Sequence, residues 1–298
     1  MPAQNTSPEH PARLAVGVIG VGRAGSALGI ALARAGHAVL AVSAVSEASV
    51  ARARARFPDA AIVPPDAVIE RADLVLLTVP DDVLPGLVSG LAATEAPLAG
   101  RMLAHASGRY GVAVLEPAAR RGALPMALHP VMTFTGRDED ADRLKGLSFG
   151  VTAPDVLRLA AEALVIEMGG EPVFIAESDR ELYHAAIAFA ANHLITLVTQ
   201  ASELLGGIGV DDPARLLGPL LSASLDNALR LGDAGLTGPV ARGDAGTVAA
   251  HVAALSASPS VRAAYVAMAR LTADRALAAG VLDASEAERL LGVLGGRP

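Results

Sequence analysis

A glycine loop between two apolar runs constrains the fold of this chain more than any other feature. The loop separates a strand, a helix and a second strand, which the sequence predicts at residues 14–19, 23–35 and 38–43. Gly20 permits the tight turn, Gly22 lets the backbone approach a pyrophosphate, and Gly25 lets the helix pack close to the strand. The free N–H groups at the helix N-terminus would face the phosphates. We therefore predict a dinucleotide site here, the alternative being a glycine-rich turn that binds nothing.

The residues after the second predicted strand favour NADP over NAD. An acid that binds the ribose hydroxyls of NAD is expected about 20 residues after the loop. This chain has hydroxyl residues there, Ser43 and Ser46, and the nearest acid follows later. Arg52, Arg54 and Arg56 come next and would attract a 2′-phosphate, although a solvated helix face explains the last two equally well.

Further strand-like runs alternate with helical segments, which predicts a mostly parallel, doubly wound sheet. They lie at residues 73–79, 102–105, 125–129, 147–152 and 172–175. Ligands of such sheets bind beyond the carboxyl ends of the strands. Three polar motifs follow strands in this way: TVPDD (Thr78–Asp82), HASG (His105–Gly108) and HPVMTF (His129–Phe134). We expect them to line the site.

From residue 177 onward the strand pattern stops, and five helices are predicted at residues 178–206, 213–231, 244–256, 259–279 and 284–294. The predicted fold is an α/β Rossmann-like doubly wound domain followed by an all-α C-terminal domain. The expected bounds are a disordered tail at 1–12, a dinucleotide-binding domain at 13–176 and a helical substrate and dimerisation domain at 177–298.

The first of these helices carries a small, polar face. Ala185, Ala188 and Asn192 follow a three-to-four spacing and share that face. A buried Asn must be hydrogen-bonded, either to a neighbouring helix or to a ligand. His184 lies about 80° around the helix and about 12 Å along it from Asn192, so both can border one cleft. Packing and ligand binding explain this face equally well.

A second motif lies at residues 236–252, LTGPVARGDAGTVAAHV. Asp244 is expected to cap a helix, with Thr247 three residues on. Gly238-Pro239 sets a turn that holds Arg242 at the helix start, where it would bind a carboxylate or phosphate. The alternative is a surface arginine beside a capping turn.

Composition excludes several classes of function. The chain of 298 residues has a formal net charge of −7, so it lacks the basic footprint of a nucleic-acid-binding protein. It contains no cysteine, which excludes disulfides, thiol nucleophiles and thiolate metal sites, and we predict no metal site. The first 12 residues lack the pattern of a signal peptide. Asn192, His193 and Gln200 interrupt the most apolar long stretch, which argues against a membrane span. We expect a soluble cytoplasmic protein.

The order of GVIGVGRAG, TVPDD, HASG, HPVMTF, YHAAIAFAANH and TGPVARGDAGT resembles a bacterial family that joins a Rossmann-like domain to a helical domain of unknown function, DUF2520. The resemblance runs from about residue 14 to the C-terminus. More distantly, the chain is similar to the 6-phosphogluconate dehydrogenase-like superfamily, which includes β-hydroxyacid dehydrogenases, ketopantoate reductase and pyrroline-5-carboxylate reductase. That resemblance implies hydride transfer from NADPH in a cleft between sheet and helical domain, within a dimer.

Some site residues carry over by this resemblance. Ser107-Gly108 matches the Ser-Gly near the nicotinamide and substrate carboxylate of the hydroxyacid dehydrogenases, and Asn192 matches the Asn on the first helix of their second domain. Their catalytic lysine would fall at Ala188, and Lys145 is the only lysine of this chain, so a lysine-assisted mechanism does not transfer. The family also has an arginine where this chain has Val45, which weakens the preference for NADP over NAD.

We therefore expect an NAD(P)H-dependent reductase of a small carboxylated ketone or imine, such as a 2-oxo acid resembling ketopantoate. His184 or His129, with a pKa near neutrality, would be the general acid, Asn192 would hold the carbonyl oxygen and Arg242 the carboxylate. The rival from another class is a dinucleotide-binding sensor or scaffold without turnover; hydrolytic or lyase chemistry has no supporting motif.

The predicted catalytic and substrate residues are His184, Asn192, Ser107, His129 and Arg242. The predicted dinucleotide-binding residues are Gly20, Gly22, Arg23, Ala24, Gly25, Ser43, Ser46, Thr78, Val79, Pro80 and His105. The helical half is apolar, and the chain has only 3% aromatic residues with which to fill a core. We therefore expect a homodimer through that half.

Overall fold

The computed structural model describes residues 13–295, and these divide into two compact units between Ala191 and Asn192, inside one long helix. We call them the N-terminal unit and the C-terminal unit. The tail expected at residues 1–12 lies outside the described residues. The domain boundary expected after residue 176 stays a prediction.

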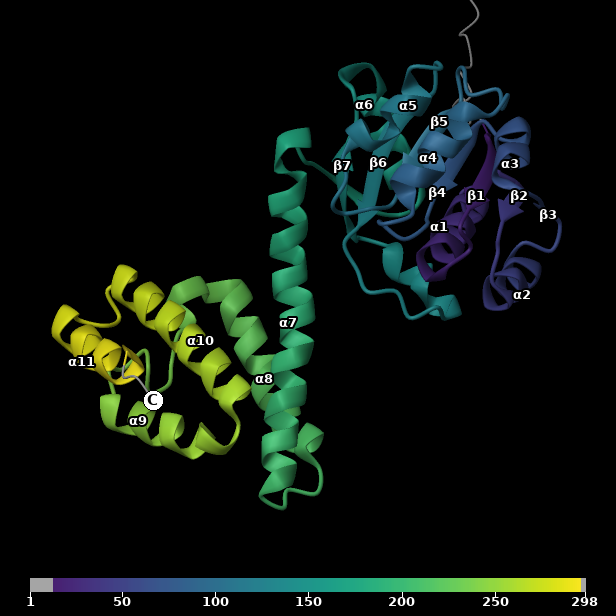
Figure 1. The fold of residues 1–298 in the computed structure, drawn as a ribbon. Coiled ribbons are helices and arrows are strands. Elements are labelled where there is room, and N and C mark those ends of the chain that lie inside the picture. Colours follow the sequence, from purple (N-terminus) through teal and green to yellow (C-terminus); the bar gives the residue numbers. More distant parts are fainter. Residues whose placement is uncertain (1–12, 296–298) are drawn as a thin grey trace, which may run out of the picture. The chain divides into compact units, whose positions relative to one another are not determined.

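The N-terminal unit is built on an eight-stranded sheet with the order β3-β2-β1-β4-β5-β6-β7-β8 (Figure 1). The strands are β1 (Ala15–Ile19), β2 (Ala38–Ser43), β3 (Ala61–Ile62), β4 (Leu74–Leu77), β5 (Met102–His105), β6 (Leu124–Pro130), β7 (Ser148–Thr152) and β8 (Glu171–Phe174). All neighbours are parallel except β6 and β7, which are antiparallel. The predicted doubly wound, mostly parallel sheet is confirmed; the two-residue strand β3 was not predicted.

Helices cover both faces of this sheet. Apolar side chains of α1 (Arg23–Arg34), α2 (Glu47–Arg56) and α6 (Arg158–Glu167) join one core cluster. Those of α3 (Pro65–Arg71), α4 (Leu84–Ala93) and α5 (Glu116–Ala119) join the other. The strands between the two clusters are almost continuously apolar because they are buried on both faces.

The remaining helices are α7 (Arg180–Gly207), α8 (Pro213–Leu231), α9 (Ala245–Ala254), α10 (Pro259–Ala278) and α11 (Ala284–Gly295). The predicted all-α second half is confirmed, with bounds within a few residues of the expected ones. Short 3₁₀ helices complete the described chain: η1 (Val112–Leu115), η2 (Asp138–Asp140), η3 (Asp142–Leu144), η4 (Asp155–Leu157), η5 (Glu177–Asp179), η6 (Gly232–Gly235) and η7 (Leu255–Ala257).

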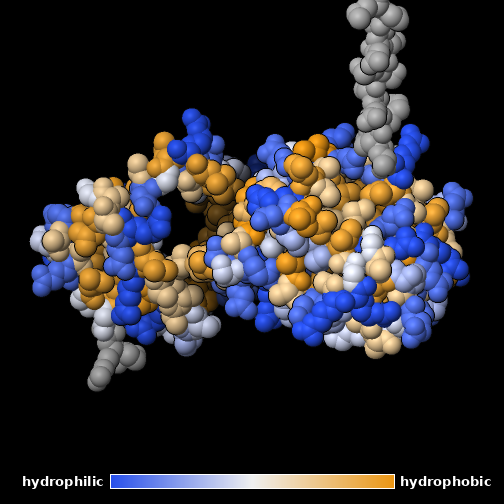
Figure 2. All heavy atoms as spheres, turned by 90° about the horizontal axis from the view of Figure 1, so that it is seen from above, coloured by the Kyte–Doolittle hydropathy of each residue, from blue (hydrophilic) through white to orange (hydrophobic). Residues whose placement is uncertain are grey.

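The C-terminal unit buries its apolar residues unevenly. Its core cluster is formed by α9, α10, α11 and the segments beside them. Helix α8 has no buried residue in the single chain, and Arg180 is the only buried residue of α7. Ile208 and Leu229 are both 79% exposed, and apolar residues are visible at the surface in Figure 2. These helices leave apolar surface without a covering element in the described chain.

One helix, α7 with the turn before it (Glu177–Gly207), is long and apolar enough to cross a membrane by length and composition alone. None of the qualifying window is buried within the described residues. A single helix of this kind is weak evidence for a span, since helices that pack against other protein surfaces have the same composition.

Candidate functional site

The glycine loop follows β1, and its three glycines meet three different constraints. Gly20 has a φ of +98°, which favours glycine, and its N–H donates to Ser43 O at 2.9 Å. A Cβ on Gly25 would lie 2.3 Å from both Gly20 O and Thr78 Oγ1, so this position admits no side chain. A Cβ on Gly22 would meet no atom within 4 Å. Gly20 and Gly25 are thus required by the fold, whereas the open space at Gly22 is available to a ligand.

The N-terminus of α1 opens directly from this loop. Gly22 is its N-cap, no side chain caps the helix, and the first turn has no acid. The N–H groups of Arg23, Ala24 and Gly25 belong to the first turn, where a helix has no carbonyl partners of its own. An uncapped helix N-terminus behind an open glycine fits an anionic pyrophosphate.

The end of β2 supplies the residues predicted to bind a 2′-phosphate. Ser43 is buried, and Ser46 is exposed but caps α2 by accepting Ser49 N–H at 3.2 Å. Arg52 is half-buried, and its Nε donates to Val21 O at 3.2 Å, which brings its guanidinium against the glycine loop. Val45 is almost wholly exposed. No acid therefore occupies the position where NAD-binding sheets have one.

Thr78, Val79 and Pro80 follow β4 beside the loop. Thr78 Oγ1 donates to Gly20 O at 2.7 Å, and Thr78 N–H donates to Ile19 O at 2.9 Å. These bonds tie the end of β4 to the turn of the loop. Thr78 and Val79 are half-buried and Pro80 is exposed. The three residues thus border the edge of the sheet where the loop lies.

His105 ends β5 and holds the next motif in place. Its Nε2–H donates to Gly111 O at 2.8 Å, and its Nδ1 accepts Ser107 N–H at 3.2 Å. Burial lowers the pKa of His105 to about 4, against the opposing hydrogen bond to Gly111. The ring is 1% exposed and both nitrogens are used, so this side chain positions the turn. Its predicted contact with a dinucleotide stays a prediction.

Ser107 and Gly108 form the turn itself, and both are buried. Ser107 Oγ accepts Tyr110 N–H at 3.2 Å and retains its own proton to donate. A Cβ on Gly108 would lie 2.8 Å from His184 Cδ2 and 2.9 Å from His129 Nε2. Two imidazoles, from β6 and from α7, therefore converge on this glycine, with ring centroids 6.3 Å apart.

A tyrosine fixes one of these imidazoles. His129 Nδ1 lies 2.8 Å from Tyr183 Oη, and the two rings meet edge-on at 89°. The phenol passes over β7 at Gly150, where a Cβ would lie 2.1 Å from the oxygen. Gly150 pairs directly with His129 in the sheet. The missing side chain of Gly150 therefore lets Tyr183 reach His129.

A buried arginine lies beside this pair. Arg180, the first residue of α7, is 1% exposed. Its Nε donates to Thr152 Oγ1 at 2.7 Å, and its Nη2 donates to Gly150 O at 3.1 Å and Ala127 O at 3.3 Å. Nη1 has no hydrogen-bond partner, and Arg180 makes no ion pair within residues 13–295. Its charge thus stays uncompensated by a contacting carboxylate.

Burial and this charge set the protonation of the cluster. Burial lowers the pKa of His129 to about 4, and Arg180 and His184 lower it further. Burial raises the pKa of Tyr183, while Arg180 and the Gly150 backbone act against that rise. The expected near-neutral pKa is therefore wrong for His129, because its ring is shielded from water and faces a cation. At pH 7 His129 and Tyr183 are both neutral.

Two family models match the chain: a Rossmann-like domain over residues 1–130 and the domain of unknown function DUF2520 over residues 147–272. The chain joins a Rossmann-like domain to a DUF2520 domain. The boundary between the models falls inside the sheet, so Gly108 and His129 belong to the Rossmann-like part. Gly150, Arg180 and Tyr183 belong to the DUF2520 part. The histidine cluster is thus built by both parts within one compact unit.

Solved structures share this fold. A protein of Bacteroides fragilis provisionally named an NADP oxidoreductase is 20% identical, with a TM-score of 0.72, over 88% of this chain and 98% of its own. A pyrroline carboxylate reductase of Plasmodium falciparum with NADP bound is 13% identical, with a TM-score of 0.56, over 90% and 98%. An imine reductase variant of Myxococcus stipitatus in complex with NAD+ is 18% identical, with a TM-score of 0.58, over 94% and 100%. A comparison with curated proteins found no match.

Two predicted residues of the DUF2520 part lie in the C-terminal unit. Asn192 is exposed in the single chain, so its expected burial is wrong there. The spacing on α7 identified a shared face correctly but could not tell what covers it. Arg242 is exposed in the turn after Gly238, whose φ is +94°, and Asp244 caps α9 as predicted, accepting Thr247 N–H at 3.0 Å. The roles of Asn192 and Arg242 toward a substrate stay predictions.

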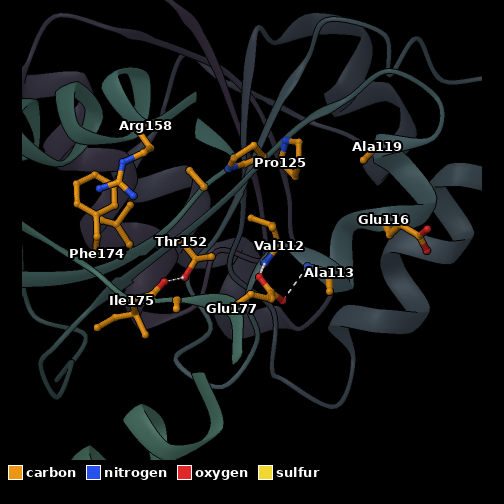
Figure 3. Close-up of a pocket in the computed structure, with 14 residues that line it drawn as sticks. Val112, Ala113, Glu116, Ala119, Pro125, Thr152, Arg158, Phe174, Ile175 and Glu177 are labelled. Carbon is orange, nitrogen blue, oxygen red and sulfur yellow. Dashed lines mark hydrogen bonds between the residues drawn. The ribbon is translucent and has the colours of Figure 1, made fainter. Parts of the chain in front are cut away.

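A separate pocket of about 630 Å³ opens beside the ends of β7 and β8 (Figure 3). Its walls are mostly apolar, and none of the predicted site residues lines it. Glu177 closes one side by accepting Val112 N–H at 2.7 Å and Ala113 N–H at 3.1 Å, and Arg158 stacks on Phe174. The carboxylate is thus already used to cap η1.

Sequence reasoning missed Arg180, Tyr183 and Gly150. The signal for Gly150 was available, because a glycine inside a strand indicates close approach by another group. Tyr183 lies next to His184, yet its partner is 54 residues away in the sequence. Nothing in the local pattern distinguishes Arg180 from a solvated arginine at the start of a helix.

Proposed function

We propose that this protein is an NADP-dependent reductase of a small carboxylated ketone or imine, NAD being the less favoured cofactor. One observation carries the proposal: an open glycine at a helix N-terminus and a buried histidine cluster occupy neighbouring strand ends on one edge of the sheet. That edge is where ligands of doubly wound sheets bind. The likeness to NADP- and NAD+-bound reductases supports it through the fold.

The glycine loop and the first turn of α1 would hold the pyrophosphate, with Arg52 beside the loop for a 2′-phosphate. Thr78, Val79, Pro80 and Ser107 would border the nicotinamide. The bound cofactor supplies the hydride. We expect NADPH to bind more tightly than NADH, and equal or reversed affinities in a fluorescence titration would overturn that preference.

The substrate would lie against the Ser107-Gly108 turn. Ser107 retains a hydroxyl proton to donate, and His184 or His129 would supply the proton to the reduced group. His129 is neutral above about pH 4, so it would act as a neutral N–H donor. Asn192 would hold the carbonyl oxygen and Arg242 the carboxylate, with a ketopantoate-like 2-oxo acid as one candidate.

We further propose a cytoplasmic homodimer through the helical half. Helix α8 has no buried residue in the single chain, and apolar side chains of α7 and α8 are exposed. A second copy would cover this surface, since exposed apolar patches of this kind mark association sites.

The cofactor assignment has a matched test. Gly22→Val places a side chain in the open space of the loop, and the φ of −79° at Gly22 accepts valine. Gly86→Val, on the exposed side of α4, also adds a side chain where no atom lies within 4 Å. We expect Gly22→Val to abolish NADPH binding and Gly86→Val to leave it unchanged. Unchanged affinity in Gly22→Val would show that the loop binds no dinucleotide.

The second candidate function is a dinucleotide-binding sensor or scaffold without turnover. The observation in its favour is the absence of a lysine at Ala188 and throughout the helical half. NADPH consumption measured with a panel of 2-oxo acids and cyclic imines separates the two. Binding of NADPH without consumption in the presence of any of them would favour the sensor.

A further inference from the structure

The orientation of the His129–Tyr183 hydrogen bond follows from its surroundings. Tyr183 is a neutral phenol, and its oxygen receives a hydrogen bond from the backbone of Gly150. A phenol oxygen that already accepts has its own O–H available to donate. The acceptor at 2.8 Å is His129 Nδ1. His129 therefore carries its proton on Nε2.

That Nε2–H is directed at the Ser107-Gly108 turn. Nε2 lies within 3 Å of the place where a Cβ of Gly108 would stand, and the absence of this Cβ leaves room for a small group. The second imidazole, His184, borders the same place through Cδ2. A substrate atom seated there would meet a neutral N–H donor whose orientation Tyr183 fixes.

The charge of this cluster is positive. Arg180 is buried beside Tyr183, with the guanidinium carbon 5.5 Å from the centre of the phenol ring. The other groups whose charge acts on the cluster are His105, His184, Glu177 and Asp81. Glu177 is engaged by the backbone of η1, and Asp81 acts on His105. Arg180 is thus the one charged group in the described chain that is both buried and in contact with the Tyr183 ring.

We propose that this cluster makes the site selective for a carbonyl oxygen over an iminium nitrogen, with Tyr183 supplying the proton through His129. This inference rests on the proposed function and narrows its substrate class. Hydride adds to the carbonyl carbon, and the C=O π pair moves to oxygen. The oxygen takes the proton from His129 Nε2, while Nδ1 takes the proton from Tyr183 Oη.

The chain then holds a Tyr183 phenolate that accepts from His129 Nδ1–H, from the Gly150 backbone and from the charge of Arg180. After the product leaves, a solvent proton at Nε2 returns the Nδ1 proton to Tyr183. His129 is the catalytic residue in this scheme, and Tyr183 and Arg180 are positioning residues. A positive site stabilises the negative charge that develops on a carbonyl oxygen.

An imine places opposite demands on the site. Reduction of an imine is fastest when its nitrogen is protonated, which makes the substrate a cation. A buried guanidinium without a contacting carboxylate disfavours a cation at this position. A histidine that is neutral at pH 7 also cannot protonate the nitrogen before hydride addition. The same groups that favour the carbonyl therefore disfavour the iminium.

The first experiment uses the cofactor-free protein. Nitrogen-15 NMR of the His129 ring should show the Nε2–H tautomer, without protonation between pH 5 and 8. Tyr183→Phe removes the partner of Nδ1 and should mix the two tautomers. Tyr265→Phe is the matched control, since Tyr265 Oη also lies near a histidine Nδ1, that of His251, at 2.9 Å. A proton on Nδ1, or protonation of His129 near pH 6.5, would overturn the proposal.

The second experiment measures NADPH consumption with a ketopantoate-type 2-oxo acid and with 1-pyrroline-5-carboxylate. We expect kcat/KM to be at least about tenfold higher for the oxo acid. Tyr183→Phe should lower kcat about 10²-fold while KM changes little, and Tyr265→Phe should change neither. An equal or higher kcat/KM for the imine overturns the proposal.

If neither compound is reduced, the proposed function fails and the selectivity is measured without turnover. Each compound is added to the cofactor-free protein, and the His129 Nε2 resonance is followed. A shift with the oxo acid alone supports the selectivity. A shift with the imine, or with neither compound, overturns it.

Discussion

The chain contains two histidine–tyrosine pairs with nearly the same geometry and different surroundings. His129 and Tyr183 have ring centroids 5.6 Å apart, and His251 and Tyr265 have them 5.8 Å apart, both edge-on. The first pair borders the buried Arg180 in the N-terminal unit. The second joins α9 to α10, with His251 exposed.

Burial raises the pKa of both tyrosines, but only Tyr183 has a guanidinium that opposes the rise. The hydrogen bond alone therefore does not distinguish a catalytic pair from a structural one. Exclusion of water, a neighbouring charge and an open position beside the imidazole make that distinction. The predictions below test it from the largest expected effect to the smallest.

The largest effect is expected from removing the imidazole. His129→Ala takes away the N–H donor of the site, and we expect turnover of a 2-oxo acid to fall about 10³-fold. His251→Ala removes the corresponding ring of the other pair and should leave turnover unchanged. The check is kcat/KM together with NADPH affinity, which should be the same in both variants. A comparable loss in both would remove the distinction between the pairs.

Association of the helical half is the next effect. Leu229 on α8 is exposed, and we propose that a second copy covers it. Leu229→Glu should weaken the dimer about 10²-fold, because a carboxylate would replace an apolar contact. Val156→Glu, at a fully exposed position of the N-terminal unit, is the control. Light scattering at micromolar concentration checks it; a monomeric wild-type protein would contradict the proposed dimer.

The buried histidines should make stability depend on pH. The pKa of His105 is lowered from 6.5 to about 4 in the folded protein, so the unfolded chain binds a proton that the folded one does not. Stability is therefore complete above pH 6.5 and is lost as the pH falls toward 4.

For His105 we expect a loss of about 2 kcal/mol between pH 7 and pH 5 in urea unfolding. His105→Gln should flatten this dependence, whereas His251→Gln should leave it in place because His251 is exposed. The same slope in the wild type and His105→Gln would contradict the lowered pKa.

The smallest effect concerns a cap in the C-terminal unit. Asp244 accepts two hydrogen bonds from Thr247 at the start of α9, which lower the pKa of Asp244. Asp244→Ala should cost about 1 kcal/mol of unfolding free energy and leave NADPH binding unchanged. Asp212→Ala at the start of α8 is the matching cap variant. A loss of cofactor affinity in Asp244→Ala would give this cap a role beyond stability.

Much of the fold could be predicted because its signals are local. Residues 102–105 and 213–231 were predicted with the bounds that the structure has. The antiparallel pairing of β6 and β7 could not, since strand direction depends on how the chain returns to the sheet. Asn192 shows the limit for the site: a face of one composition packs against the same chain or against another, and spacing does not distinguish them.

The sequence by itself determined the glycine loop, the strand ends that carry polar residues, and the change to an all-helical second half. These depend on backbone freedom and on periodicity, which neighbouring residues set. Only the tertiary structure decided that Tyr183 reaches His129 across Gly150, that Arg180 is buried beside them, and that His129 is neutral at pH 7. Pairing and desolvation depend on residues far apart in the sequence, brought together by the register of the sheet.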